Sequence, residues 1–221
     1  MILVGTEKDL DVTYGLYSHK ISPDPLLIEL KKFVKDKYNG EIINYILETL
    51  KQGQGYFYRL CLFTWSDDDE QFLQEQNSFD YDRKKIEEIS SYFKKLIVKY
   101  QKHKEYSNID LFVCTCEIKS ALRDRIVDSC KFLRDLLEKE FNDIYRVIWD
   151  FGEFEILYYT DENIKNNNKN GKSKKIKEII NNEIKKRDLY NCFDKGVDVN
   201  FYSKQLIDEK YEGSLFYFSR R

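Results

Sequence analysis

Several residue types are scarce in this chain of 221 residues. Alanine occurs once, at Ala121, while proline and histidine occur twice each. Two isolated histidines identify no Ser–His or Cys–His catalytic pair, and the chain contains neither a Walker loop nor a dinucleotide-binding glycine pattern. No apolar run approaches the roughly 20 residues of a membrane-spanning helix. The commonest catalytic, cofactor and membrane signatures are therefore absent from the sequence.

Cysteine is also sparse. The five cysteines are an odd number and form no dense framework, which favours free thiols in a reducing compartment. Cys114 and Cys116 lie two residues apart and are expected to be buried structural thiols, because zinc needs about four ligands in paired short spacings. We therefore expect a cytoplasmic protein with no metal site and no cofactor.

Charge is abundant and nearly balanced. Asp and Glu number 39 against 37 Lys and Arg, so the formal net charge is −2, and 42% of the residues are hydrophobic. Such a chain can bury a substantial core. The balance argues against a whole-surface nucleic-acid binder, which usually has a basic face.

The hydrophobic patterning predicts an α+β protein with a mixed β-sheet and amphipathic helices packed against it. Expected strands are residues 1–4, 56–65, 109–116, 144–149, 154–159, 197–206 and 214–219. Expected helices are residues 25–38, 42–50, 82–103, 122–141 and 174–190. Residues 161–173 are polar and low in complexity, and predict an exposed, mobile loop. With no internal repeat and no linker, a single domain over residues 1–221 is expected.

A Glu-x-Lys motif follows the expected strand at residues 109–116, which is almost wholly apolar. Glu117 and Lys119 stand at its end, and Asp110 stands at its start. This pattern resembles the signature of restriction-endonuclease-like nucleases. The resemblance implies that the two carboxylates hold Mg²⁺ and that the lysine positions or deprotonates the attacking water. The alternative is an ordinary strand end with a solvated salt bridge.

An acidic segment follows another expected strand. Asp67, Asp68, Asp69 and Glu70 are consecutive, and loops at strand ends are frequent functional positions. They predict contact with a cation or with a basic partner. The alternative is a solvated turn.

The expected hairpin over residues 144–159 mixes carboxylates with aromatic rings. The candidate partner-binding residues here are Trp149, Asp150, Phe151, Glu153 and Glu155. Aromatic anchors with charges around them are typical of protein-binding surfaces. The alternative is a hairpin with one face in the core and one in water.

A lysine-rich stretch supplies a local positive charge. Lys172, Lys174, Lys175 and Lys177 are candidates for binding nucleic-acid phosphates. The alternative is the solvated face of a helix.

Three functions follow from these observations. The first is a non-enzymatic protein-binding module, such as an inhibitor or immunity-type protein, whose acidic-aromatic surface docks on a toxin or other protein with a basic surface. The second is a Mg²⁺-dependent nuclease, with nucleic acid as its partner. The third is a structural domain of a larger assembly. The sequence does not define an oligomeric state.

Overall fold

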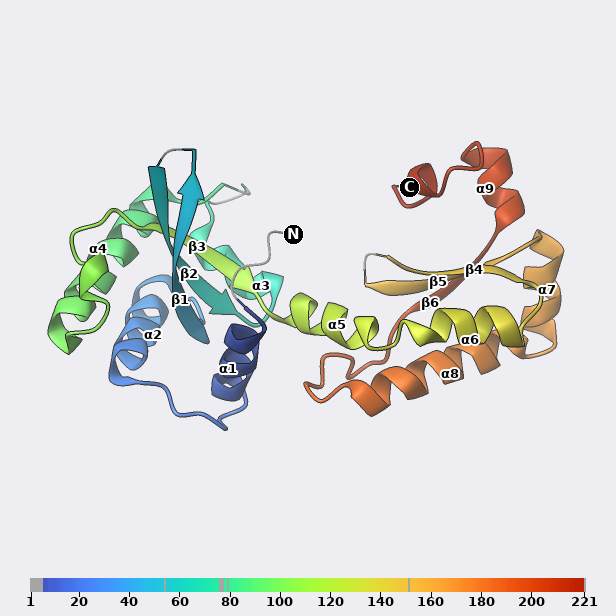
Figure 1. The fold of residues 1–221 in the computed structure, drawn as a ribbon, viewed down its shortest axis with the longest axis horizontal. Helices are drawn as coiled ribbons and strands as arrows, with labels where there is room; N and C mark the ends of the chain where they lie inside the picture. Colours follow the sequence, from blue (N-terminus) through green and yellow to red (C-terminus); the bar gives the residue numbers. More distant parts are fainter. Residues whose placement is uncertain (1–5, 54, 76–77, 79, 151, 221) are drawn as a thin grey trace. The chain divides into compact units, whose positions relative to one another are not determined.

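The computed structural model describes residues 6–53, 55–75, 78, 80–150 and 152–220, with the side chains of Gln52 and Asp150 excepted. The expected strand at residues 1–4 lies outside this described part. The chain divides into two compact units, Met1–Ala121 and Leu122–Arg221. Each unit has its own three-stranded sheet (Figure 1). This division does not test whether the two units fold as a single domain, so the single domain over residues 1–221 stays a prediction.

The first unit contains a mixed sheet in the order β1-β2-β3. Its elements are α1 (Glu7–Tyr17), α2 (Pro25–Tyr38), β1 (Asn44–Gln52), β2 (Gly55–Thr64), α3 (Asp67–Glu70), the 3-10 helix η1 (Gln71–Leu73), α4 (Arg83–Tyr100), the 3-10 helix η2 (Lys104–Tyr106) and β3 (Phe112–Glu117). β1 and β2 are antiparallel, and β2 and β3 are parallel.

Helices α2 and α4 cover one face of this sheet. Their buried side chains, among them Leu30 and Phe93, pack against Leu60, Leu62 and Val113 of the strands. Asp24 caps α2 by accepting a hydrogen bond from the Leu27 amide, as Asp before Pro predicts. The resulting core fixes where β2 and β3 end.

The second unit contains a mixed sheet in the order β4-β5-β6. Its elements are the end of α5 (Lys119–Asp128), α6 (Phe132–Glu140), β4 (Ile144–Asp150), β5 (Glu153–Tyr158), α7 (Asp161–Lys169), α8 (Lys172–Arg187), β6 (Val199–Ser203), α9 (Lys204–Lys210) and α10 (Leu215–Phe218). Figure 1 shows α6 and α8 on one side of this sheet and α9 on the other. The central strand β5 is covered on both faces, since Phe154 through Tyr158 are all buried.

The predicted α+β class is confirmed, with its strands divided between two mixed sheets. The helix expected at residues 42–50 is wrong: Asn44 begins β1, which pairs with β2 as far as Gln52 and Gly55. Tyr45 and Leu47 alternate onto the core face, so the apolar residues follow the period of a strand. The strand expected at residues 214–219 is also wrong, because Ser214 caps the short helix α10 there. Among the described helices, none is both long and apolar enough to cross a membrane.

Residues 161–169 form α7 where a mobile loop was expected. Thr160 and Asn163 make a reciprocal capping box at its start, which satisfies two backbone donors. Asn167 is only 2% exposed, and its amide donates a 2.6 Å hydrogen bond to Asp143. Lys172 donates to the same carboxylate oxygen at 2.9 Å. Burial opposes ionisation of Asp143, but these two donors outweigh it and hold its pKa below the usual range. Despite its polar composition, this segment therefore forms a helix that is anchored to Asp143.

We expect Asn167→Ala to lower the free energy of unfolding by about 1–3 kcal/mol, because it removes a buried amide that donates to the half-buried Asp143 carboxylate. Chemical denaturation of the two proteins measures the difference. Asn168→Ala is the matched control: Asn168 is exposed on the same helix and should change stability by less than about 0.5 kcal/mol. Equal effects at the two positions would contradict the anchoring role of Asn167.

Candidate functional site

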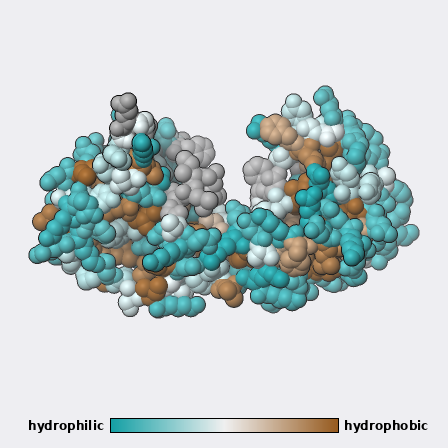
Figure 2. Space-filling view, viewed as in Figure 1, coloured by the Kyte–Doolittle hydropathy of each residue, from teal (hydrophilic) through white to brown (hydrophobic). Residues whose placement is uncertain are grey.

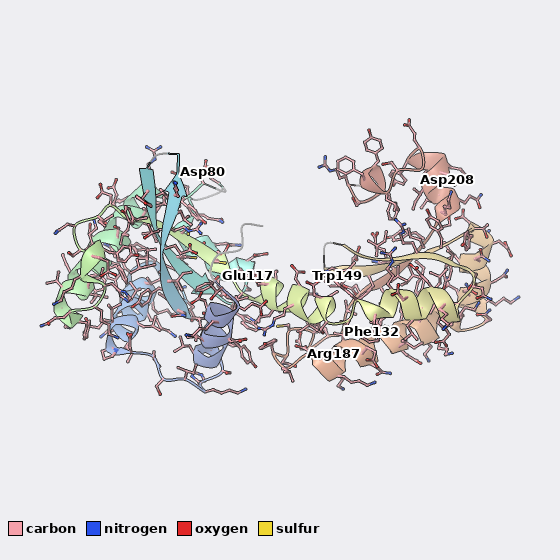
Figure 3. All side chains as sticks on the ribbon, in the orientation of Figure 1. Asp80, Glu117, Phe132, Trp149, Arg187 and Asp208 are labelled. Atoms are coloured by element: carbon pink, nitrogen blue, oxygen red, sulfur yellow. The ribbon has the colours of Figure 1, made fainter. Side chains whose placement is uncertain are left out.

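The carboxyl ends of the parallel strands β2 and β3 bring together the most unusual carboxylates of the first unit. In the parallel register Thr64 lies beside Glu117. The chain then continues from β2 into α3 and from β3 into α5, and the Lys119 amide donates to the Trp65 carbonyl across this end at 3.2 Å. Ligands of open α/β sheets commonly bind outside the carboxyl ends of parallel strands. Figure 3 labels Glu117 at this end of β3.

The acidic segment is a short helix at this edge. Ser66 and Asp69 form a capping box that starts α3, so the Asp69 carboxylate accepts from the Ser66 amide and hydroxyl at 3.0 and 2.7 Å. Asp67 and Asp68 are exposed, whereas Glu70 is half-buried. The four acidic residues therefore have different roles: Asp69 holds the helix, and Asp67 and Asp68 face solvent.

Glu70 and Glu117 have perturbed acidities. Burial, followed by the negative charges of Asp67 and Glu117, raises the pKa of Glu70 to about 7, although the Thr115 hydroxyl and the Glu117 backbone partly offset this. Burial and the charge of Asp67 also raise the pKa of Glu117, against hydrogen bonds from Ser120. The Ser120 amide contacts both Glu117 carboxylate oxygens, at 2.8 and 3.0 Å. Carboxylates with raised pKa values gathered at one edge are typical of functional sites.

We define the acidic edge as Asp67, Asp68, Asp69, Glu70 and Glu117. Among the described residues, no lysine, arginine or histidine forms an ion pair with any of these five carboxylates. Some carboxylates on described helices do have such a partner, for example Glu29 with Lys99. The carboxylates of the acidic edge thus have no ion-pair partner within the described part of the chain.

The nuclease residues do not converge. Asp110 precedes β3 and Glu117 ends it, so the rise of about 3.3 Å per residue separates them by more than about 15 Å. Asp110 is fully exposed and pairs with Lys94 at 3.4 Å. Lys119 begins α5. Within the described part of the chain, no three His, Cys, Asp or Glu side chains are placed to hold one metal ion. The Mg²⁺ site that the nuclease hypothesis requires therefore has no geometric support among the described residues.

The hairpin residues lie in the second unit. Trp149, labelled in Figure 3, donates from its indole to Asp124 at 3.4 Å and packs against Phe154 and Phe193. Glu153 accepts from Asn200 at 2.6 Å, and Glu155 is only 2% exposed. Phe151 and the side chain of Asp150 lie outside the described residues. Glu155 is therefore a core position rather than a surface one.

Trp149 also lines a groove of about 770 Å³ in the second unit. The groove runs beside β4 between the α5–α6 connection and α10, and its basic side chains are Lys131, Arg134 and Arg146. Lys131 pairs with Asp128 and Arg134 with Glu138. Figure 2 shows hydrophobic patches among the hydrophilic side chains of this unit. Because its charges are largely paired, the groove lacks the imbalance of the acidic edge.

The candidate phosphate-binding lysines are mostly engaged. Lys172 contacts Asp143 at 2.9 Å, Lys174 contacts Glu178 at 3.9 Å and Lys175 contacts Glu140 at 2.8 Å. Lys177 lies over the ring of Phe201 at 5.6 Å. These contacts stabilise α8 and its neighbours, and they leave little free positive charge for a phosphate backbone.

Sequence reasoning missed one neighbour of Cys114 and Cys116. Cys61 is the register partner of Cys114, and contact with the other two thiols, together with burial, raises the pKa of Cys61. Cys61 and Cys114 are buried. A raised pKa disfavours the reactive thiolate, which agrees with the structural role expected for these thiols.

Comparison with known proteins adds no relative. No family model, no curated protein and no solved structure matches this chain.

Proposed function

We propose that the protein is a non-enzymatic binding module, of the inhibitor or immunity type, which docks on a basic surface of another protein through the acidic edge. One observation carries the proposal: the parallel register of β2 and β3 places the acidic segment after Thr64 beside Glu117, and none of these carboxylates has an ion-pair partner among the described residues. Like charges at close range cost free energy. A partner that brings lysine or arginine to this edge recovers that cost on binding.

The position of the edge suits docking. Asp67 and Asp68 project from α3 into solvent and supply the negative charge, while Glu70 and Glu117 are half-buried beside them. Such a field accelerates association with a basic partner and weakens with added salt. Trp65, which immediately precedes α3, places an aromatic ring in the same connection, and aromatic residues are enriched in binding interfaces.

The other two functions have less support. The nuclease requires Asp110 and Glu117 to share a cation, and they lie at opposite ends of β3. The role of a structural domain in a larger assembly does not explain why the carboxylates of the acidic edge have no ion-pair partner. We therefore place the binding module first, and the same experiment addresses all three.

The test is capture of the tagged full-length protein from its native host. Lysates with and without nuclease treatment are compared at about 50 and about 300 mM salt, and bound proteins are identified by mass spectrometry. The acidic-edge variant is Asp67→Asn, Asp68→Asn and Glu70→Gln, which leaves the Asp69 cap intact. The matched control makes the same change of charge at exposed positions of the second unit, namely Glu162→Gln, Asp194→Asn and Glu212→Gln.

We expect a stoichiometric basic protein that survives nuclease treatment. The wild-type protein and the control variant retain it, the acidic-edge variant loses it at least about tenfold, and salt weakens it. Retention by the acidic-edge variant would falsify the proposed interface. Recovery of nucleic acid alone would favour the nuclease, and a salt-resistant complex independent of the edge would favour the assembly domain.

A further inference from the structure

A second site lies in the first unit, in a pocket of about 450 Å³. Its walls are the end of α1, one turn of α2, the segment that leads into β1, and Trp65 directly after β2. The volume falls within the range of small-molecule sites. We call it the α1–α2 pocket, and the docking function proposed above does not use its lysines.

The α2 wall concentrates positive charge. Lys31, Lys32 and Lys35 all line the pocket, and Lys31 and Lys35 are one turn apart on one face of the helix, a spacing at which like charges repel. Lys35 pairs with Glu41 at 2.7 Å. Within the described residues, no carboxylate forms an ion pair with Lys31 or Lys32. The pocket thus has two ammonium groups available to an anion.

Lys31 is the more unusual of the two. Its side chain is half-buried, and burial lowers its pKa, with only a partial offset from the charge of Glu41. A desolvated ammonium group without a paired anion is costly. An anionic ligand beside it removes that cost.

Two aromatic rings form another part of the wall. Tyr17 and Trp65 are stacked, with ring centroids 4.1 Å apart and planes within 2° of parallel. Tyr17 is 42% exposed. A parallel pair at a pocket wall offers a flat surface on which a further planar ring can stack.

The remaining wall combines two carboxylates with the apolar side chains of Leu16, Ile42 and Ile43. Glu41 and Asp69 line the pocket with carboxylate oxygens, which can accept hydrogen bonds only. Gly40 holds the chain close to Phe72: a Cβ atom at this position would lie 2.4 Å from its ring. The pocket also contains Trp65, which directly follows the carboxyl end of β2.

From this arrangement we infer that the α1–α2 pocket binds a small molecule that joins a planar, N–H-bearing ring to a phosphate, the chemistry of a nucleoside phosphate. Lys31 and Lys32 hold the phosphate as point charges. The ring lies against the stacked pair of Tyr17 and Trp65. The acceptors of Glu41 and Asp69 take hydrogen bonds from its N–H groups, so a ring with more such donors binds more tightly.

The test uses the full-length protein with Trp149→Phe, which leaves Trp65 as its one tryptophan. Guanosine 5′-monophosphate and adenosine 5′-monophosphate are titrated while Trp65 fluorescence is recorded, and guanosine alone and inorganic phosphate alone are the matched probes. We expect saturable quenching by the nucleotides below about 1 mM. We also expect the nucleotides to bind at least about tenfold more tightly than either half-molecule.

Variants locate the binding. Lys31→Ala with Lys32→Ala should raise the dissociation constant at least about tenfold, whereas Lys84→Ala with Lys95→Ala, exposed on α4, should leave it unchanged. Trp65→Leu should abolish binding measured by calorimetry, and Trp65→Phe should retain part of it. Circular dichroism melts confirm that each variant is folded.

Three results would overturn the inference. They are no saturable binding of either nucleotide, equal binding in the Lys31/Lys32 and Lys84/Lys95 variants, or equal affinity for phosphate alone. Because these lysines lie outside the acidic edge, loss of nucleotide binding with partner capture intact separates this site from the docking function.

Discussion

Phe93→Ala should lower the free energy of unfolding by about 3–5 kcal/mol. Phe93 is completely buried on α4, and its ring meets Tyr45 edge-on with centroids 5.0 Å apart. Removing it leaves a cavity between α4 and the sheet, which the surrounding side chains fill only in part. Urea denaturation followed by circular dichroism measures the loss.

Val98→Ala provides the control on the same helix. Val98 is 66% exposed, so its truncation should cost less than about 0.5 kcal/mol. Comparable losses at positions 93 and 98 would mean that α4 does not pack on the sheet as described. The carboxyl ends of β2 and β3 would then have no fixed support.

Glu70→Gln should remove a pH dependence of stability. The pKa of Glu70 is about 7 in the folded protein against an ordinary value of 4.5, so the folded state binds the proton more tightly than the unfolded state. The stabilising contribution of the protonated group is complete below pH 4.5 and is lost as the pH rises to about 7. The wild-type protein should therefore lose stability across that window and level off above it.

The expected size follows from the shift. A difference of this size corresponds to about 3 kcal/mol in full, and solvent screening of a half-buried carboxylate reduces it to about 1 kcal/mol. Glu70→Gln should thus be about 1 kcal/mol more stable than wild type at about pH 8 and nearly equal to it at about pH 4. Denaturation curves at four pH values test this.

Asp68→Asn is the comparison for Glu70. Asp68 belongs to the same short helix and is exposed, so its variant should keep the wild-type slope between about pH 4.5 and 7. Glu117 leaves a smaller slope of the same sign in every variant, because its pKa is also raised. A Glu70→Gln protein with an unchanged slope would refute the crowding of carboxylates on which the proposed function depends.

Local patterns were sufficient for the elements with strong periodicity or caps. The stripe of Ile89, Phe93 and Leu96 predicts α4, and the apolar run before Glu117 predicts β3. They were insufficient for β1, since its apolar residues fit a helical as well as an alternating spacing and only pairing with β2 decides between them. They also failed for α7, which is held by the capping box of Thr160 and Asn163 and by the contact of Asn167 with Asp143.

The individual residues of the candidate site could be predicted from the sequence, but their proximity in the fold could not. The sequence predicts residues 67–70 as a candidate partner surface and Glu117 as a candidate Mg²⁺ ligand. Their proximity depends on the parallel register of β2 and β3, which joins positions far apart in the sequence. Lys31 and Lys32 resemble any solvated helix face until Trp65 is placed beside them.

The same register has a consequence for the order of events during synthesis. Pairing Thr64 with Glu117 closes a long loop. Such non-local contacts form late, because the chain loses loop-closure entropy before the contacts contribute any stabilisation. A nascent chain that has exposed α3 but not yet β3 carries the aspartates of the acidic edge without Glu117 and without the burial of Glu70. The partner that we propose should consequently distinguish a finished first unit from an incomplete one still on the ribosome.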